Sequence, residues 1–221
     1  MKNDAVITEI SREKCERLCK ENGFSRNDII LTFGSTRPGD EVLAAYCWEN
    51  LKEEYPALRL VIAPRHLQRL DEALYPFKEE QVTKRSDVVA GRQNWHARVF
   101  FLDTIGELTG FYAISSIAVI GGSFFPGVEG HNPLEPAALG IPVIFGPFMG
   151  NFPDAAQLLL DRGGALQVQD ERELIEALHL LIRNPLSCER IGRKGRKAVL
   201  DNCGAIKRNA DIILNSIREE R

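Results

Sequence analysis

An arginine and a histidine directly follow an apolar run that ends in proline, and they could bind an anion there. The run covers residues 58–64, and Arg65 and His66 come next. A planar guanidinium can hold a phosphate through two parallel hydrogen bonds. A lone arginine is more often a solvated surface residue. Its place directly after a predicted strand is what favours a phosphate ligand.

A glycine-rich loop further along the chain could bind a phosphate or a ribose. Segment 121–135 holds four glycines, which let backbone approach a ligand closely, and it ends in Asn132, Pro133, Leu134 and Glu135. Asn132 suits a helix N-cap, with Pro133 in the first helical position and Glu135 at capping-box spacing. The loop is equally consistent with a well-capped helix and with an anion site, where Glu135 would accept hydrogen bonds from ribose hydroxyls. It lacks the G-x-G-x-x-G spacing of a dinucleotide site.

Two further polar residues have simpler interpretations. Glu107 falls in the first turn of a predicted helix, where the macrodipole favours any carboxylate. His131 could donate to a phosphate, but an ordinary loop residue is the simpler interpretation.

These residues lie where predicted strands end and helices begin. We predict strands at 29–33, 58–63, 99–102, 117–120, 142–145 and 165–168, and helices at 40–55, 68–74, 107–115, 134–139, 154–160 and, over the last third, 171–218. Continuously apolar strands are typical of parallel sheets buried on both faces. The alternation predicts an α/β, Rossmann-like doubly wound parallel sheet forming a single domain over 1–221. Ligands of such sheets bind beyond the carboxyl ends of the strands.

Composition excludes several classes of protein. The 221 residues carry a net charge of −3, which gives no reason to expect nucleic-acid binding. No run approaches the ~20 apolar residues of a membrane span, and the N-terminus lacks a signal peptide's apolar core. The five cysteines are odd in number and include no Cys-x-x-Cys pair, so we expect reduced thiols and no zinc site. A soluble intracellular protein is the expectation.

A basic tract covers residues 190–197 of this otherwise acidic chain. Such a run is usually a solvated helix face. The alternative is attraction to an anionic lipid surface or an acidic sugar.

Several motifs occur in the same order as in the C-terminal half of the 3-deoxy-D-manno-octulosonic acid (Kdo) transferases. They are Met-Lys-Asn-Asp at 1–4, Phe-Gly-Ser-Thr at 33–36, Pro-Arg-His at 64–66, Arg-Ser at 85–86, Ile-Gly-Glu-Leu at 105–108, Gly-Gly-Ser at 121–123, His-Asn-Pro-Leu-Glu-Pro-Ala-Ala at 131–138, Gly-Ile-Pro-Val at 140–143, Gly-Pro at 146–147 and Asn-Phe at 151–152. The chain resembles this family through nearly its whole length, which implies the C-terminal half of a two-domain GT-B glycosyltransferase.

The resemblance implies that this half binds the nucleotide of CMP-Kdo, and the implied site residues follow the family motifs. They are Pro64 and Arg65, with Arg65 on the phosphate; Ile105, Gly106 and Glu107; and Asn132, Pro133, Leu134 and Glu135, with Glu135 on the ribose hydroxyls. Ile105 replaces the family's usual methionine, a conservative change. The segment Thr-Arg-Pro-Gly-Asp at 36–40 departs from the commoner Thr-His-Glu-Gly-Glu, so no function is carried onto it.

The family transfers Kdo from CMP-Kdo to the lipid A precursor at the cytoplasmic face of the bacterial inner membrane. The resemblance places the general base and the membrane-associating segment in an N-terminal domain absent from this chain. Residues 1–4 resemble the interdomain linker. We therefore expect no catalytic residue, metal or cofactor in this chain, an inverting reaction in the whole enzyme, and no transfer by the chain alone. Two alternatives stay open: another GT-B enzyme of nucleotide sugars, such as a UDP-sugar transferase or epimerase, and a stand-alone nucleotide-binding module.

Overall fold

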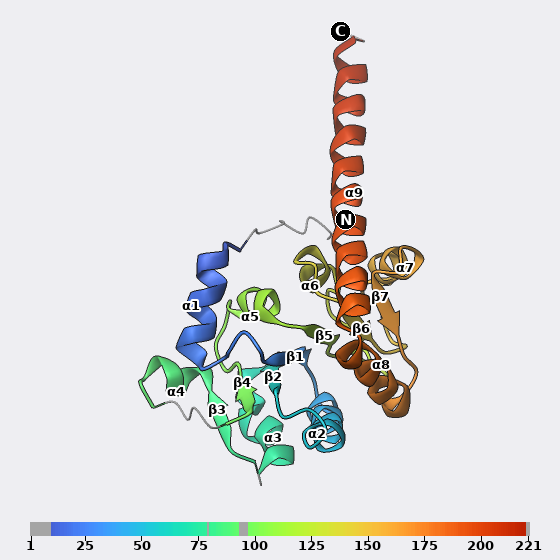
Figure 1. Ribbon diagram of the computed structural model, residues 1–221. Coiled ribbons are helices and arrows are strands. Elements are labelled where there is room, and N and C mark those ends of the chain that lie inside the picture. The colour runs from blue at the N-terminus through green and yellow to red at the C-terminus, as the bar shows by residue number, and fades with distance from the viewer. Residues whose placement is uncertain (1–9, 79, 93–96, 220–221) are drawn as a thin grey trace.

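Seven parallel strands form one sheet in the computed structural model, which describes residues 10–78, 80–92 and 97–219 (Figure 1). Each strand pairs in parallel with its neighbours, in the order β3-β4-β2-β1-β5-β6-β7. The strands are β1 (Ile29–Thr36), β2 (Leu58–Pro64), β3 (Val82–Lys84), β4 (Val99–Phe101), β5 (Ile117–Ile120), β6 (Val143–Phe145) and β7 (Ala165–Gln167). The predicted doubly wound parallel sheet is confirmed. The motif at 1–4 lies outside the described residues.

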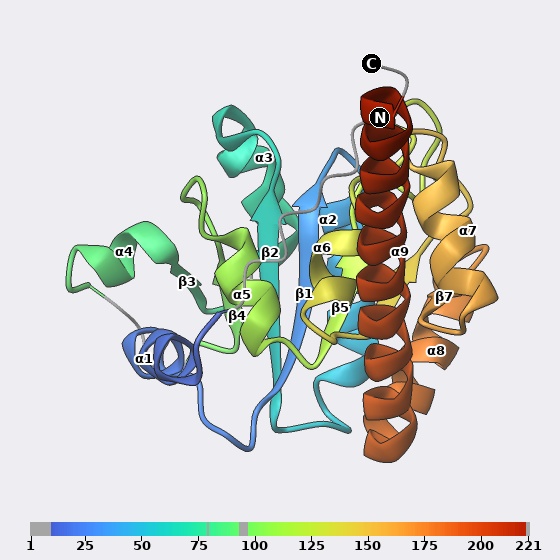
Figure 2. The same cartoon turned by 90° about the horizontal axis from the view of Figure 1, so that it is seen from above.

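Helices cover both faces of the sheet. They are α1 (Arg12–Asn22), α2 (Asp40–Leu51), η1 (Leu67–Arg69), α3 (Leu70–Leu74), η2 (Tyr75–Phe77), α4 (Arg85–Val89), α5 (Leu108–Ile114), α6 (Leu134–Ala138), α7 (Pro153–Asp161), α8 (Glu171–Arg183) and α9 (Pro185–Glu219). Helices α2, α3 and α8 pack on one face, and α1, α5, α6, α7 and α9 pack on the other (Figure 2). This arrangement explains why the strands are apolar on both sides.

The core follows from the apolar runs that predicted the strands. The four residues of β5 are all buried, and β1 is buried from Ile30 to Gly34. Trp48 and Leu51 of α2 pack with β1 and β2 on one face, whereas Phe111 of α5 packs with Phe100 on the other. The central strands are therefore held rigidly, and they fix where the loops at their carboxyl ends begin.

The chain winds away from the centre of the sheet in both directions. Strands β2, β4 and β3 lie on one side of β1, and β5, β6 and β7 lie on the other. In open sheets of this kind, ligands bind where the strand order reverses, beyond the carboxyl ends. The loops after β1, β2, β4 and β5 therefore surround the expected site.

Strand β3, helices α1 and α4 and the short helix η2 were not predicted from the sequence. The predicted helical last third consists of two helices, α8 and α9. Figure 1 shows the C-terminal part of α9 extending beyond the other elements.

The basic tract at 190–197 lies on α9, where neighbouring carboxylates offset part of its charge. Arg193 lies 3.7 Å from Glu189, and Lys197 lies 2.9 Å from Asp201. These pairs agree with a solvated helix face. Among the described residues, none of the helices is both long and apolar enough to cross a bilayer.

Candidate functional site

A cavity of about 740 Å³ lies at the carboxyl edge of the sheet, and residues from three separate loops line it. Arg65 comes from the loop after β2, and Ile105 and Gly106 come from the loop after β4. Asn132 lies near the end of the loop after β5, and Glu135 follows in the first turn of α6. The remaining lining residues are Ser35, Leu108, Thr109, Tyr112, Gly130, His131, Asn151 and Phe152. The structure thus brings together five of the nine residues that the resemblance implied.

Close backbone contacts hold the loops after β1 and β5 together under this cavity. A Cβ atom on Gly121 would lie 2.5 Å from the carbonyl oxygen of Ser35, so only glycine fits there. The Oδ2 atom of Asp40 accepts hydrogen bonds from the backbone N–H groups of Gly122, at 2.7 Å, and of Arg37, at 2.8 Å. Backbone atoms and the buried Asp40 carboxylate therefore fix the two loops against each other.

Arg65 presents an exposed guanidinium at the end of β2. Pro64, the last residue of the strand, is buried, and the Arg65 backbone N–H donates to the Thr36 carbonyl at 3.0 Å. Within the described part of the chain, no carboxylate forms an ion pair with Arg65. An arginine whose backbone is fixed and whose charge is unpaired is well suited to bind an anionic group from outside.

The first turn of α6, directly after the loop that follows β5, supplies Glu135 at the edge of the cavity. Surrounding protein raises the pKa of Glu135 above its ordinary value, opposed by a hydrogen bond from Asn132 and by the charge of Arg65. Pro133 and Leu134 are buried, so they shape the loop rather than face the cavity. A carboxylate beside an arginine can accept hydrogen bonds from hydroxyl groups while the arginine binds a phosphate.

The capping box predicted at this loop does not form. Helix α6 begins at Leu134, whose N–H donates to the Asn132 Oδ1 atom at 3.1 Å. Glu135 accepts from the Asn132 side chain at 3.4 Å, not from its backbone. The prediction of Asn132 as the N-cap and Pro133 as the first helical residue was wrong, because the N-cap is Pro133, which makes no side-chain capping bond.

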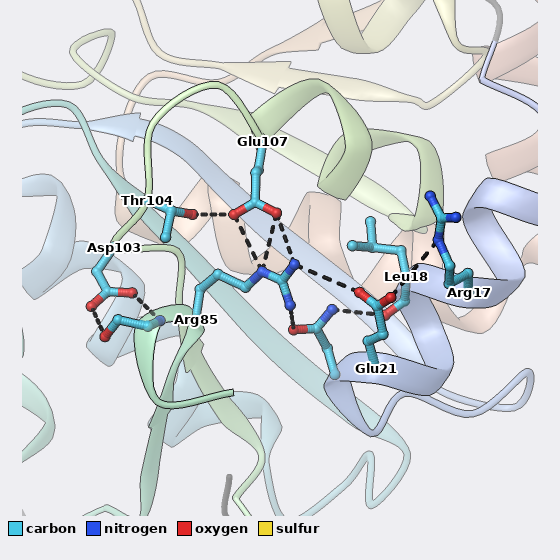
Figure 3. A network of polar contacts seen from close by, with 9 residues as sticks. Arg17, Leu18, Glu21, Arg85, Asp103, Thr104 and Glu107 are labelled. Carbon is cyan, nitrogen blue, oxygen red and sulfur yellow. Dashed lines mark hydrogen bonds and ion pairs between the residues drawn. The ribbon is translucent and has the colours of Figure 1, made fainter. Parts of the chain in front are cut away.

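The turn after β4 presents Ile105 and Gly106 to the cavity, whereas the carboxylate of Glu107 bonds Arg85 and does not line it. Ile105 is 89% exposed, and Gly106 has a φ of 86° with open space around it. Glu107 makes no capping bond to α5, although the sequence predicted a helix-stabilising charge there. Its carboxylate instead accepts from Arg85, with a shortest distance of 2.9 Å, and from Thr104 (Figure 3).

Arg85 is the centre of a polar network that the sequence analysis did not identify (Figure 3). The residue is only 8% exposed; it donates to Asn22 at 3.1 Å, and it lies 3.6 Å from the Glu21 carboxylate. Hydrogen bonds from Arg85 and Thr104 hold the pKa of Glu107 below its ordinary value, although partial burial alone would raise it. The Arg-Ser motif at 85–86 was a possible signal, but no spacing rule connects it with Glu107.

Ser86 adds a second anchor to the same turn. Its backbone N–H donates to the Asp103 carboxylate at 2.8 Å, and its hydroxyl bonds the other carboxylate oxygen. The loop after β4 is therefore tied to α4 at both Asp103 and Glu107. This places Ile105 and Gly106, which stand between them, firmly beside the cavity.

None of the residues that the structure describes forms a group of three or more His, Cys, Asp or Glu side chains placed to hold a metal ion. What the cavity offers is an unpaired guanidinium, a carboxylate and exposed backbone at a glycine turn. This combination suits a small polar ligand that carries both an anionic group and hydroxyl groups.

The parallel sheet, its helices on both faces and the cavity at its carboxyl edge define a domain of the GT-B glycosyltransferase fold. The chain aligns with a crystal structure described as the C-terminal CMP-Kdo binding domain of WaaA from Acinetobacter baumannii. The TM-score is 0.76 at 25% identity, covering 85% of this chain and 96% of that one. No protein-family model matches the chain.

The sequence matches curated 3-deoxy-D-manno-octulosonic acid transferases. It is 35% identical over 182 residues to that of Haemophilus influenzae, covering 81% of this chain and 42% of the relative. It is 30% identical over 188 residues to that of Bordetella pertussis, covering 83% of this chain and 44% of the relative. The chain belongs to the Kdo transferase family, and it spans less than half the length of these relatives.

Proposed function

We propose that this chain is the donor-binding half of a glycosyltransferase that moves Kdo from CMP-Kdo to the lipid A precursor in lipopolysaccharide biosynthesis. The observation that carries the proposal is the meeting of three loops around one cavity, with Arg65, Gly106 and Glu135 among its lining. The similarity to Kdo transferases and to a domain described as binding CMP-Kdo supports it.

In this proposal the chain's residues stabilise the leaving group. When the glycosidic bond of CMP-Kdo breaks, charge develops on the phosphate oxygens of CMP. Arg65 donates hydrogen bonds to that phosphate and stabilises the charge without a metal ion. Glu135 accepts from the ribose hydroxyls and fixes the nucleotide's orientation.

The remaining chemistry belongs to a second domain of the same polypeptide. The acceptor hydroxyl needs a base on the face of the sugar opposite the phosphate, and attack there inverts the anomeric carbon. Closure of two domains would exclude water and align the reactants. We propose that the N-terminal domain supplies this base and contacts the inner-membrane surface, and that the present chain alone transfers no Kdo.

Calorimetric titration of the chain with CMP, UMP and UDP tests the proposed specificity. We expect CMP to bind more tightly than UMP or UDP. A clear preference for UDP would instead favour a transferase or epimerase of UDP-sugars. If none of the three nucleotides binds, the proposal is wrong.

Substitution of Arg65 tests the proposed site. Arg65→Ala should weaken CMP binding by about 1.5–3 kcal/mol, because a charged hydrogen bond to phosphate is lost. The matched control is Arg26→Ala, which removes an exposed arginine next to the amino end of β1, at the opposite edge of the sheet. Equal CMP affinity in both variants would remove Arg65 from the site.

A further inference from the structure

Arg37 lies in the loop after β1, in the segment whose sequence departs from the family pattern, and it contacts two histidines from other loops. Its Nε atom donates to the Nε2 atom of His131 at 3.3 Å, and its Nη1 atom is within hydrogen-bond distance of the Nε2 atom of His66. The side chain is half-buried. Three strand-exit loops therefore meet at one guanidinium.

These contacts orient Arg37 without neutralising its charge. A guanidinium has five N–H donors and no acceptor, so the imidazole nitrogen that faces it must accept the hydrogen bond in each contact. Burial, together with the charges of Arg37 and Arg65, lowers the pKa of His131 to about 4, which keeps that ring neutral near pH 7. Two of the five N–H groups are used, and three remain, enough for a bidentate bond to a carboxylate.

The Asp40 carboxylate interacts electrostatically with Arg37 but does not bond its guanidinium. Among the residues that the structure describes, no carboxylate forms an ion pair with its guanidinium. Asp40 is close, but its Oδ2 atom accepts from the backbone N–H groups of Arg37 and Gly122. Glu41 accepts from Thr36 instead, at 2.8 Å.

Arg37 lies beside the cavity, although it is not one of the residues that line it. His131, which it contacts, lines the cavity together with Arg65. Arg37 and Arg65 both act electrostatically on His131, so two positive groups lie around the same ring. A ligand with one anionic group would need only one of them.

We propose that Arg37 forms a second anion subsite, which binds the carboxylate of the donor sugar while Arg65 binds the phosphate. This inference rests on the proposed function. A CMP-linked sugar acid carries two anionic groups. Arg65 lines the cavity, and Arg37 contacts the lining residue His131, so two guanidiniums without ion pairs lie near one ligand. His66 and His131 hold the Arg37 guanidinium in place, and they reduce the entropy that a free arginine would lose on binding.

The test compares CMP, which lacks the carboxylate, with freshly prepared CMP-Kdo in calorimetric titrations. The variants are Arg37→Gln, Arg65→Gln and, as control, Arg26→Gln. Arg37→Gln should weaken CMP-Kdo binding roughly 10- to 100-fold and change CMP binding less than about twofold, because only the donor sugar has the carboxylate. Arg65→Gln should weaken binding of both ligands, and Arg26→Gln should change neither.

Two outcomes would overturn the inference while leaving the proposed function standing. In the first, Arg37→Gln weakens CMP and CMP-Kdo equally, which would make Arg37 a phosphate ligand or a structural tie. In the second, Arg37→Gln changes neither affinity. Thermal unfolding of Arg37→Gln shows whether Arg37 mainly stabilises the fold. If it does, the unfolding midpoint of the variant would fall well below that of the unaltered chain.

A third outcome would show that the proposed function itself is wrong, rather than only the inference about Arg37. If the unaltered chain binds neither CMP nor CMP-Kdo, the proposed function fails and the carboxylate subsite fails with it. If CMP binds and Arg65→Gln weakens it, the proposed function stands, and the Arg37 result alone decides the inference.

Discussion

Replacing Glu107 with glutamine removes one charge from the Arg85 network and keeps the size of the side chain. Arg85 is 8% exposed and would retain Asn22 at 3.1 Å and Glu21 at 3.6 Å. Removing one partner of a fully buried pair costs roughly 3–5 kcal/mol, and a charged hydrogen bond is worth about 1.5–3 kcal/mol. The Glu107 side chain is 33% exposed and Glu21 remains, so we expect a loss of about 2 kcal/mol in the free energy of unfolding.

Urea unfolding of Glu107→Gln beside the unaltered chain measures this loss. The matched control is Glu176→Gln, since Glu176 is exposed on α8 and should change stability by less than about 0.5 kcal/mol. A loss for Glu107→Gln no larger than that of the control would refute the assignment of Glu107 as an anchor of the turn.

The pH dependence gives a second check on the same variant. The pKa of Glu107 is depressed in the folded chain, so its contribution to stability is present above the ordinary value of 4.5 and is lost as the pH falls below it. The difference between the unaltered chain and Glu107→Gln should therefore shrink below pH 4.5. A difference that stays constant through that range would contradict the ion pair.

Two further substitutions test the packing of the loops around the site. Burial raises the pKa of Asp40 from 3.8 to about 6, so its contribution to stability is full below pH 3.8 and is lost as the pH rises through 6. In urea unfolding, the stability of Asp40→Asn relative to the unaltered chain should therefore rise by up to about 3 kcal/mol over this range. A difference between the two that does not change with pH would contradict the raised pKa. A Cβ on Gly34 would lie 1.8 Å from the Tyr112 hydroxyl oxygen, so Gly34→Ala should lower stability by about 1–3 kcal/mol or more in thermal unfolding. The control Gly110→Ala meets only an ordinary contact at 3.5 Å in α5 and should be neutral or stabilising, so similar losses in both variants would speak against the clash.

The sequence predicted the central sheet well because its strands are apolar on both faces. Strands β1, β2 and β5 begin where predicted, because each coincides with a continuous apolar run of strand length. Strand β3 was missed because Val82–Lys84 is a three-residue edge strand without an apolar run. Helix α1 was missed because its face is only weakly apolar, and α4 because five residues give no period to detect.

The candidate site was predictable only where local chemistry revealed it. Arg65 and Glu135 stand at strand exits, and the structure places both beside the cavity. Their roles toward a nucleotide stay predictions. The pairing of Arg85 with Glu107, and of Arg37 with His66 and His131, depends on tertiary contacts between residues 22 to 94 positions apart, which no local pattern encodes.

A crystal structure of the chain with bound CMP would show whether the three loops form one nucleotide site. We expect the phosphate within about 3 Å of the Arg65 guanidinium, the ribose hydroxyls at Glu135, and the nucleotide against the Gly106 turn. A CMP molecule bound elsewhere, such as in the groove beside α1 lined by Cys15 and Cys19, would contradict it. So would a CMP inside the cavity that leaves Arg65 without contact.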